Sequence, residues 1–408
     1  MTTKWMMYAK KADFNGIGKQ YGISPVTARI IRNRDVVGDE ALTRYLRGTL
    51  KDLYSPHLLL HMDDAVALLA EKIQGGSAIR IVGDYDIDGV CSTYLLYRAL
   101  KRVGAKVDYE IPDRVKDGYG INEQIIEAAA ADGVDTVLTC DNGIAAVSQI
   151  ARAKELGMTV IVTDHHDILC EDGKEMVPPA DVIVNPKQAA CQYPWKQICG
   201  AVVAWKLVQA LYERFGVPAA EWEEMIEFAA IATVGDVMRL QDENRIIVKE
   251  GLRRVCRTKS VGLKKLVEKN NLDICHLSAY HIGFVIGPCL NAGGRLQTAK
   301  LALSMLLCED EAEADRMAQE LKELNDTRKT MTQEGIDAAA LLVEEKYMQD
   351  KVLVVYLPDC HESLAGIIAG RLRERYHKPS LVLTRAEDGV KGSGRSIEGY
   401  HMFEALVE

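Results

Sequence analysis

The 408-residue chain is long enough for two or three domains, and its 48% apolar content is ordinary for globular protein. The formal net charge of −9 argues mildly against a general nucleic-acid coat protein. No apolar run reaches the roughly 18 residues that cross a bilayer, and the lysine-bearing N-terminus has no signal-peptide core. We therefore expect a soluble, cytoplasmic protein with no membrane partner.

The ten cysteines stand singly in apolar segments, and none belongs to a C-x-x-C pair. This spacing favours reduced thiols over disulfides and argues against a structural zinc site. We expect buried, unpaired cysteines.

The first 60 residues form a basic arm, with ten Lys/Arg against five Asp/Glu. The pattern predicts short helices interrupted at Gly16, Gly22 and Pro25, and Pro56 closes the arm before a helix over 62–73. Such an arm can contact a polyanion, although a solvated basic surface fits the same composition.

From residue 78 the pattern alternates between short β-rich runs and helices. Strands are predicted at 78–82, 105–111, 136–139, 158–163 and 181–184. Helices are predicted near 89–103, 122–132 and 143–156. This alternation predicts an α/β fold with a parallel sheet covered by helices on both faces. Ligands of such sheets bind beyond the carboxyl ends of the strands.

Acidic clusters follow three of these strands. Asp84, Asp86 and Asp88 follow the first, Asp141 follows the third, and 164–167 (Asp-His-His-Asp) follows the fourth. Carboxylates this close repel one another unless they are solvated or share a positive charge. Three clusters on one rim favour an oxygen-ligated divalent ion over a solvated turn.

Other interpretations of single acidic residues remain open. A calcium EF-hand also begins D-x-D-x-D-G, but its twelfth position here is Leu95 instead of Glu. Asp141 taken alone fits a helix N-cap equally well. Asp236 ends an apolar, helix-like run over 228–240, and a buried carboxylate there must be paired, hydrogen-bonded or metal-bound; a plain helix stop is the alternative.

Residues 241–347 are predicted to be mostly helical, with a long connecting helix through 309–342. The segment 286–296 breaks this pattern with three glycines. Glycines allow close backbone approach to a ligand, and Arg295 could then fork onto a phosphate; a plain turn is the competing interpretation.

The last segment returns to a strand, helix and strand pattern, at 352–357, 363–376 and 380–384. It is followed by a predicted loop, 391–396, in which Lys391, Ser393 and Arg395 alternate with glycines. Basic side chains, hydroxyls and exposed amides suit a phosphate cradle. The spacing excludes a Walker loop.

Taken together, these motifs resemble the DHH phosphoesterase superfamily, whose name-giving triplet stands here at 164–166. The resemblance extends over nearly the whole chain and is strongest to the single-strand-specific exonucleases of that superfamily. The matching segments are 33–34, 50–56, 83–89, 111–120, 141–143, 164–166, 235–237, 288–295, 361–372 and 391–396. Several motifs in the expected order make this resemblance specific.

The resemblance implies a parallel-sheet DHH domain joined by a long helical connector to a smaller α/β DHH-associated domain. We expect the arm over 1–60, the DHH catalytic domain over 61–240, the connector over 241–347 and the substrate-binding DHH-associated domain over 348–408. The last domain ends before the glycine-glycine-histidine stretch of the family, so we expect the chain to be part of a longer protein.

The resemblance also implies the metal ligands of a two-ion centre. They are Asp86, Asp88, Asp141, His165 and Asp236, with Asp141 bridging the ions. Val82 stands where relatives often carry a metal-assisting histidine, and Asp84 would compensate for it. Carboxylates and one imidazole, without a thiolate, favour Mn²⁺ or Mg²⁺. Two such ions would hold a phosphate and activate water for in-line hydrolysis.

The resemblance assigns three further roles around the phosphate. His166 would face the scissile phosphate, and Asp164 would orient an imidazole. The substrate would be held by Arg114, Arg295, His361, Lys391, Ser393 and Arg395. The family likeness suggests a helicase and a single-strand-binding protein as partners.

Three functions follow from these residues. The first is a processive 5′-to-3′ exonuclease on single-stranded DNA with a 5′ phosphate, serving repair or recombination; the arm, connector and second domain are larger than a mononucleotide needs. The second is a small-substrate hydrolase for short RNA, a nucleotide or a cyclic dinucleotide, favoured by the acidic charge and the 6% aromatic content. The third is an inactive nucleic-acid-binding relative.

Overall fold

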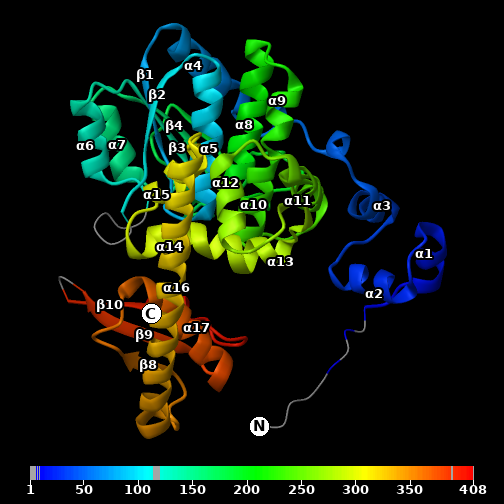
Figure 1. The fold of residues 1–408 in the computed structure, drawn as a ribbon, viewed down its shortest axis with the longest axis vertical. Helices are drawn as coiled ribbons and strands as arrows, with labels where there is room; N and C mark the ends of the chain where they lie inside the picture. Colours follow the sequence, from blue (N-terminus) through cyan, green and yellow to red (C-terminus); the bar gives the residue numbers. More distant parts are fainter. Residues whose placement is uncertain (1–5, 7, 9, 114–119, 387–388, 408) are drawn as a thin grey trace.

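The computed structural model describes residues 6, 8, 10–113, 120–386 and 389–407. Two α/β units lie at either end of one long helix, α16 (Glu311–Leu342), as Figure 1 shows. Within the described residues, no helix is both long and apolar enough to cross a membrane. The predicted α/β fold with a long helical connector is confirmed.

The larger unit is built on a parallel five-stranded sheet of order β2-β1-β3-β4-β7. Its strands are β1 (Ala78–Val82), β2 (Lys106–Glu110), β3 (Thr136–Cys140), β4 (Thr159–Thr163) and β7 (Val182–Val184). Every residue of β3 is buried, as expected for a central parallel strand covered on both faces. The short pair β5 (Cys170–Glu171) and β6 (Lys174–Glu175) forms a separate hairpin.

Helices cover both faces of this sheet (Figure 1). One face carries α6 (Glu123–Ala131) and α7 (Val147–Glu155). The other carries α4 (Met62–Gln74), α5 (Ile87–Arg102) and α8 (Gly200–Phe215). Two buried apolar clusters, one for each face, form the core.

A helical layer extends the α5 and α8 face. It contains α9 (Ala219–Glu224), α10 (Ile226–Gly235), α11 (Asp242–Arg254), α12 (Val261–Lys269), α13 (Ala279–His281), α14 (Gly287–Leu296) and α15 (Lys300–Leu307). Helix α10 is apolar and packs against α5, α8 and α11, so it is buried along most of its length. The predicted boundary at residue 240 therefore falls between two helices that pack together.

The prediction that 286–296 breaks the helical pattern is wrong, because a π-helical turn, η5 (Ile282–Ile286), leads directly into helix α14. The glycines serve close packing within a helix. A Cβ on Gly294 would lie 2.4 Å from the carbonyl oxygen of Tyr85, and one on Gly293 would lie 2.8 Å from that of Thr298. Sequence alone does not distinguish glycines that admit a ligand from glycines that admit a neighbouring backbone.

The smaller unit has a three-stranded sheet of order β10-β9-β8. Its elements are β8 (Leu353–Tyr356), η7 (Glu362–Leu364), α17 (Ala365–Tyr376), β9 (Ser380–Ala386), β10 (Gly389–Arg395) and α18 (Met402–Val407). The prediction of a loop at 391–396 is wrong for most of that segment, because Lys391 to Arg395 pair antiparallel with β9. The basic and small residues of 391–395 therefore alternate along an edge strand of this sheet.

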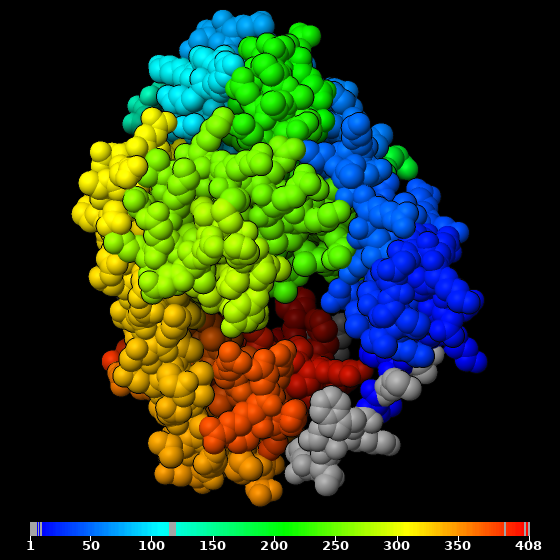
Figure 2. Space-filling view, turned by 45° about the vertical axis from the view of Figure 1, so that its right-hand side comes forward, coloured from blue at the N-terminus to red at the C-terminus, as the bar shows by residue number. Residues whose placement is uncertain are grey.

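The N-terminal arm folds into α1 (Phe14–Tyr21), α2 (Pro25–Asn33), α3 (Asp39–Arg47), η1 (Leu50–Asp52) and η2 (Pro56–Leu58). Gly22 ends α1 with φ 69°, as predicted, whereas Gly16 lies inside α1 and does not interrupt it. The arm has its own small core, including Ile31, Leu42 and Tyr45. In Figure 2 the arm stands beside the smaller unit, with a hollow between them.

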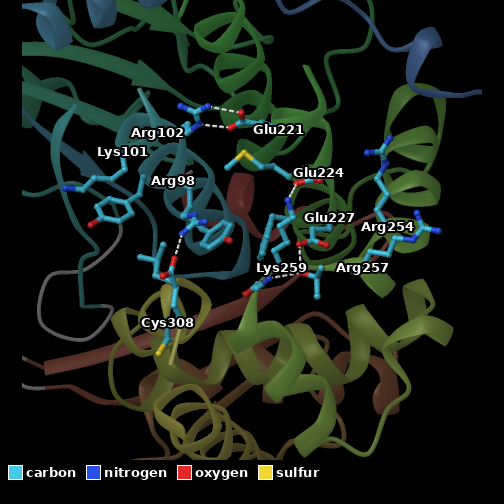
Figure 3. A pocket seen from close by; sticks show the side chains of 18 of the residues that line it. Arg98, Lys101, Arg102, Glu221, Glu224, Glu227, Arg254, Arg257, Lys259 and Cys308 are labelled. Carbon is cyan, nitrogen blue, oxygen red and sulfur yellow. Dashed lines mark hydrogen bonds and ion pairs between the residues drawn. The ribbon is translucent and has the colours of Figure 1, made fainter. Parts of the chain in front are cut away.

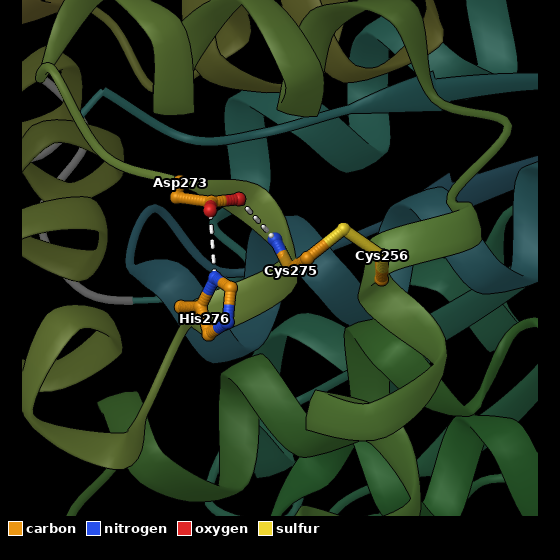
Figure 4. The surroundings of a disulfide bond; sticks show 4 residues. All are labelled: Cys256, Asp273, Cys275 and His276. Carbon is orange, nitrogen blue, oxygen red and sulfur yellow. Dashed lines mark hydrogen bonds and ion pairs between the residues drawn. A yellow bond between two sulfur atoms is a disulfide. The ribbon is translucent and has the colours of Figure 1, made fainter.

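The expectation of unpaired cysteines is wrong for two of the ten. Cys256 and Cys275 form a disulfide with their Cα atoms 4.4 Å apart (Figure 4). It joins η3 (Val255–Arg257) to η4 (Ile274–His276), which flank α12. Asp273 shapes η4 by accepting hydrogen bonds from Cys275 N at 2.9 Å and His276 Nδ1 at 2.6 Å. The pairing depends on how the chain folds back after α12, which single cysteine spacings do not encode.

Candidate metal centre

The acidic clusters predicted from the sequence meet at the carboxyl ends of β1, β3 and β4. The described residues contain three overlapping groups of side chains that could hold an ion, with ligand atoms within 4.8 Å of one another, and two of these groups share no residue. One group is Asp84, Asp86 and Asp141, and the other is Asp88, His165 and Asp236. Asp141 also lies within this distance of His165 and His166, so it stands between the two groups.

His165 lies at the centre of this cluster. Its Nε2 atom is 3.1 Å from Asp141 Oδ1, 3.5 Å from Asp88 Oδ2 and 3.8 Å from Asp236 Oδ2. Burial is the main cause that lowers the pKa of His165, so the imidazole is neutral near pH 7. A neutral imidazole surrounded by carboxylates has the protonation state of a metal ligand.

The loop after β3 shows why Asp141 reaches this centre. Asp141 has φ 61°, and helix α7 begins only at Val147 with Ala146 as its N-cap, so the alternative of a plain N-cap is wrong. Gly200 makes the close packing possible, because a Cβ at that position would lie 2.7 Å from Asp141 Oδ1. Asp tolerates the left-handed region better than most residues, so this turn is available to Asp141.

Backbone amides at two helix starts fix the other carboxylates. Asp88 accepts hydrogen bonds from Gly200 N at 2.6 Å and Ala201 N at 2.8 Å, at the start of α8. Asp86 caps α5 and accepts from Asp88 N at 2.8 Å and Gly89 N at 3.1 Å. Helix N-termini stabilise negative charge and hold these oxygens in place.

The charges of the centre are not balanced by the protein. Burial, followed by the charges of Asp88, Asp86 and Asp84, raises the pKa of Asp141 well above its usual value. Burial and then the same neighbours Asp88 and Asp86 raise the pKa of Asp236 to about 7. Asp141 Oδ1 is buried and makes no hydrogen bond to any described residue. Oxygen donors with one imidazole fit a divalent ion such as Mn²⁺ or Mg²⁺.

Asp164 orients His166 instead of the histidine next to it in sequence. Its Oδ1 accepts from His166 Nδ1 at 2.8 Å, and its Oδ2 accepts from Ile144 N at 2.9 Å. Burial alone would raise the pKa of Asp164, but the hydrogen bond and the charge of His166 lower it below its usual value. The carboxylate is therefore ionised, and the His166 side chain, 43% exposed, carries its proton on Nδ1.

Val82 takes no part in the centre. It is fully buried in the apolar cluster that contains Ile121 and Ile125. The acidic group of Asp84, Asp86 and Asp141 thus forms without a ligand from position 82.

The predicted substrate residues gather around η7 and β10, apart from Arg114, which lies outside the described residues. Arg295 donates from Nη1 to the carbonyl oxygen of Ser363 at 2.9 Å, so α14 contacts the smaller unit. His361 Nδ1 lies 2.8 Å from Ser363 Oγ. Arg395 donates to Ser393 Oγ at 3.0 Å, and Lys391 Nζ is 3.1 Å from Glu362 Oε2.

Sequence reasoning missed several residues that build these two sites. Ser363 and Glu362 link the basic side chains, while Gly366 leaves room for them, since a Cβ there would lie 2.8 Å from Arg395 Nη2. Asn291 Oδ1 accepts from Ile87 N at 2.7 Å and so ties α14 to the start of α5. No local pattern marks these residues, because each acts on a partner far away in the chain.

A large cavity lies elsewhere, at the other end of α5 (Figure 3). It has a volume of about 1710 Å³ and is lined by α5, α9, α10, η3 and α15. Arg98 pairs with Glu309, Arg102 with Glu221, and Lys259 with Glu224. The lining also includes Lys101, Arg253, Arg254 and Arg257, so its seven basic side chains outnumber its five glutamates.

Comparison with known families agrees with the two units. Residues 78–235 match the family model described as "DHH family, N-terminal domain", and residues 349–408 match the DHHA1 domain model.

Characterised relatives extend the match to almost the whole chain. The single-stranded-DNA-specific exonuclease RecJ of Bacillus subtilis is 38% identical over 96% of this chain, and the RecJ of Escherichia coli is 36% identical over 94%. The chain spans 48% of the first relative and 68% of the second.

Solved structures of RecJ proteins are also similar to this chain. RecJ from Thermus thermophilus in complex with Mn²⁺ has a TM-score of 0.81 at 31% identity, over 97% of this chain and 55% of that one. A second exonuclease RecJ bound to manganese has a TM-score of 0.75 at 35% identity, over 86% of this chain and 85% of that one.

Proposed function

This chain belongs to the RecJ family of DHH proteins, and we propose that it is a metal-dependent exonuclease that degrades single-stranded DNA from a 5′ end. The observation that carries the proposal is the pair of buried acidic groups joined at Asp141. Buried carboxylates without a balancing cation are expected to bind divalent ions, and the similar exonucleases are named for single-stranded DNA.

The two ions would be Mn²⁺ or Mg²⁺, held by Asp84, Asp86 and Asp141 on one side and by Asp88, His165 and Asp236 on the other. Bound ions of this kind lower the pKa of water and stabilise charge on a leaving oxygen. The protein's part is to hold the carboxylates in fixed positions and to offer His166, oriented by Asp164, toward the scissile phosphate.

The basic residues near η7 and β10 would bind the 5′ phosphate. Arg295, Ser393 and Arg395 present guanidinium and hydroxyl donors, and His361 and Lys391 lie on the same side of the smaller unit. Fork-shaped guanidinium groups suit a terminal phosphate. Arg114 belongs to the same predicted pocket. The predicted division into an arm, a DHH domain, a connector and a DHH-associated domain is retained in this proposal.

A cytoplasmic location and a role in DNA repair or recombination complete the proposal. A helicase and a single-strand-binding protein are its expected partners, because an exonuclease of this kind needs strands that have been opened and kept single. The support for these partners is the family resemblance.

Oligonucleotides labelled at either end test the function. With Mn²⁺, a 5′-phosphorylated single strand should be shortened from its 5′ end, while a blunt duplex should resist and EDTA should stop the reaction. Attack from the 3′ end, or loss of activity on strands longer than about five nucleotides, would contradict the proposal and favour a small-substrate hydrolase.

Substitution in the basic cluster tests whether the strand is bound by its 5′ phosphate. Arg395→Met should raise KM for 5′-phosphorylated strands and have less effect on strands with a 5′ hydroxyl. Arg385→Met, an exposed arginine on the neighbouring strand β9, is the matched control and should leave both unchanged.

A further inference from the structure

We propose that Asn244 is a positioning residue for the metal centre, because it ties the segment that carries Asp236 to the segment that holds Asp88. The proposal rests on the metal-dependent function described above. It concerns one side chain in the first turn of α11 that contacts neither the expected ions nor the substrate.

Asp236 is supported differently from the other carboxylates of the centre. Asp86, Asp88 and Asp141 follow strands of the sheet or begin the helix after it, whereas Asp236 is the C-cap residue of α10. Its side chain is 30% exposed, and the next residue, Val237, is 87% exposed with φ 56°. A carboxylate at a helix end followed by an exposed turn needs an additional anchor to keep its position.

Asn244 supplies a contact of the required kind. Its side chain is fully buried, and Nδ2 donates to the carbonyl oxygen of Arg239 at 3.1 Å and to that of Gln197 at 2.6 Å. Arg239 lies three residues after Asp236. Gln197 lies three residues before Gly200, whose amide donates to Asp88 Oδ2. One amide group therefore joins the supports of two members of the same ligand group, Asp88 and Asp236.

The neighbouring residue fixes the same helix turn from the other side. Glu243 is fully buried, and its carboxylate accepts from Tyr193 at 2.5 Å and lies 3.2 Å from Lys206 Nζ. Lys206 belongs to α8, the helix that starts at Gly200. The first turn of α11 thus contacts both α8 and the residues that lead into it, and Asn244 is its link to the Asp236 turn.

Removing this link should act mainly on one ion site. Loss of a residue bonded directly to a metal ligand typically weakens metal binding about 10–100-fold, and Asn244 acts one contact further away, so we expect about 10-fold. The group of Asp88, His165 and Asp236 should lose affinity, because both bridged segments serve it. The group of Asp84, Asp86 and Asp141 should change less, because Asp141 alone of the three packs against a bridged segment, at Gly200, while the loops after β1 and β3 anchor the group.

The test is a Mn²⁺ titration of the purified chain, followed by electron paramagnetic resonance and calorimetry, with folding checked by circular dichroism. Asn244→Ala should leave one tight site and weaken the other about 10-fold. Asn244→Ser, which keeps a shorter donor and a smaller cavity, should fall between Asn244→Ala and the wild type. Asn270→Ala is the matched control, since Asn270 also donates to a carbonyl oxygen, that of Leu266, but on α12.

The outcomes separate this inference from the function on which it rests. If the wild type binds two ions and either folded Asn244 variant binds both as tightly, the positioning role is wrong and the metal-dependent function stands. If the wild type binds no Mn²⁺, the proposed function fails, and the positioning role fails with it.

Discussion

The two ends of helix α5 differ in the charges that surround them. At its start, Asp88, Asp141 and Asp236 gather, and among the described residues only His165 lies within ion-pair distance of all three. At its end, about 21 Å away by helix length from Asp88, Arg98 and Arg102 are each paired with a glutamate. The carboxylates at the start of α5 therefore favour a cation, whereas the cleft at its end has basic side chains in excess.

Removing the central carboxylate should have the largest effect. Asp141→Ala takes away the residue between the two acidic groups, so ion binding and nucleotide release should both be lost. Because metal ions supply several kcal/mol of transition-state stabilisation, we expect a rate loss on the order of 10³-fold or more. Release of nucleotides from a 5′-labelled strand measures it.

The control for this loss is an acidic residue outside the centre. Asp337→Asn, on the exposed face of α16, should keep the wild-type rate. If Asp141→Ala keeps its activity while folded, the assignment of the carboxylate cluster around Asp141 as the active centre is wrong.

A substitution in the cleft at the end of α5 should change the free energy of unfolding instead of the activity. Burial raises the pKa of Glu227 to about 8, despite a hydrogen bond from Thr258 that opposes the shift. The folded state therefore holds this proton more tightly than the unfolded state, whose pKa is near 4.5. The stabilisation of the folded state by protonated Glu227 is complete below about pH 4.5 and is lost as the pH rises toward 8.

Glu227→Gln removes this dependence while keeping an acceptor for Thr258. Relative to wild type, the variant should gain roughly 2–4 kcal/mol of unfolding free energy between pH 5 and pH 9. Urea unfolding at a series of pH values measures the difference. If the unfolding free energies of the two proteins changed in parallel with pH, Glu227 would have an ordinary pKa.

A smaller loss is expected from the contact that orients His166. Asp164→Asn keeps the size of the side chain but weakens the hydrogen bond to Nδ1 and removes the negative charge. We expect kcat to fall about 10–100-fold with KM for the strand little changed. Steady-state kinetics check this, and a change in KM alone would assign Asp164 to substrate binding instead.

The smallest effect should come from the ion pairs of the cleft. The Arg102–Glu221 pair is about half-exposed, and exposed pairs contribute less than about 1 kcal/mol. A double-mutant cycle with Arg102→Met and Glu221→Gln should give a coupling energy below that value, decreasing with salt. A coupling above 2 kcal/mol would mean that this cleft is held together more strongly than its exposure suggests.

Local sequence patterns predicted the helices and strands more accurately than they predicted the structural roles of the glycines and cysteines. The β-rich runs and the long helix through 309–342 were placed close to their observed positions, because periodicity reports burial directly. The segment 286–296 was expected to break the helical pattern, for a ligand or as a plain turn, and 391–396 was interpreted as a phosphate-binding loop; most of these residues lie in helix α14 and strand β10. Their glycines face neighbouring backbone or side chains, which only the packed structure reveals.

The amino-acid sequence by itself determined that acidic and histidine residues gather at one rim of the sheet. Carboxylates and histidines placed directly after strands must meet at one rim of a parallel sheet, since that topology aligns the strand ends. The tertiary structure alone decided how they are held: Asp88 by the amides of α8, His166 by Asp164, and the turn after Asp236 by Asn244. These supports join residues distant in sequence, and such contacts exist only once the helices have packed.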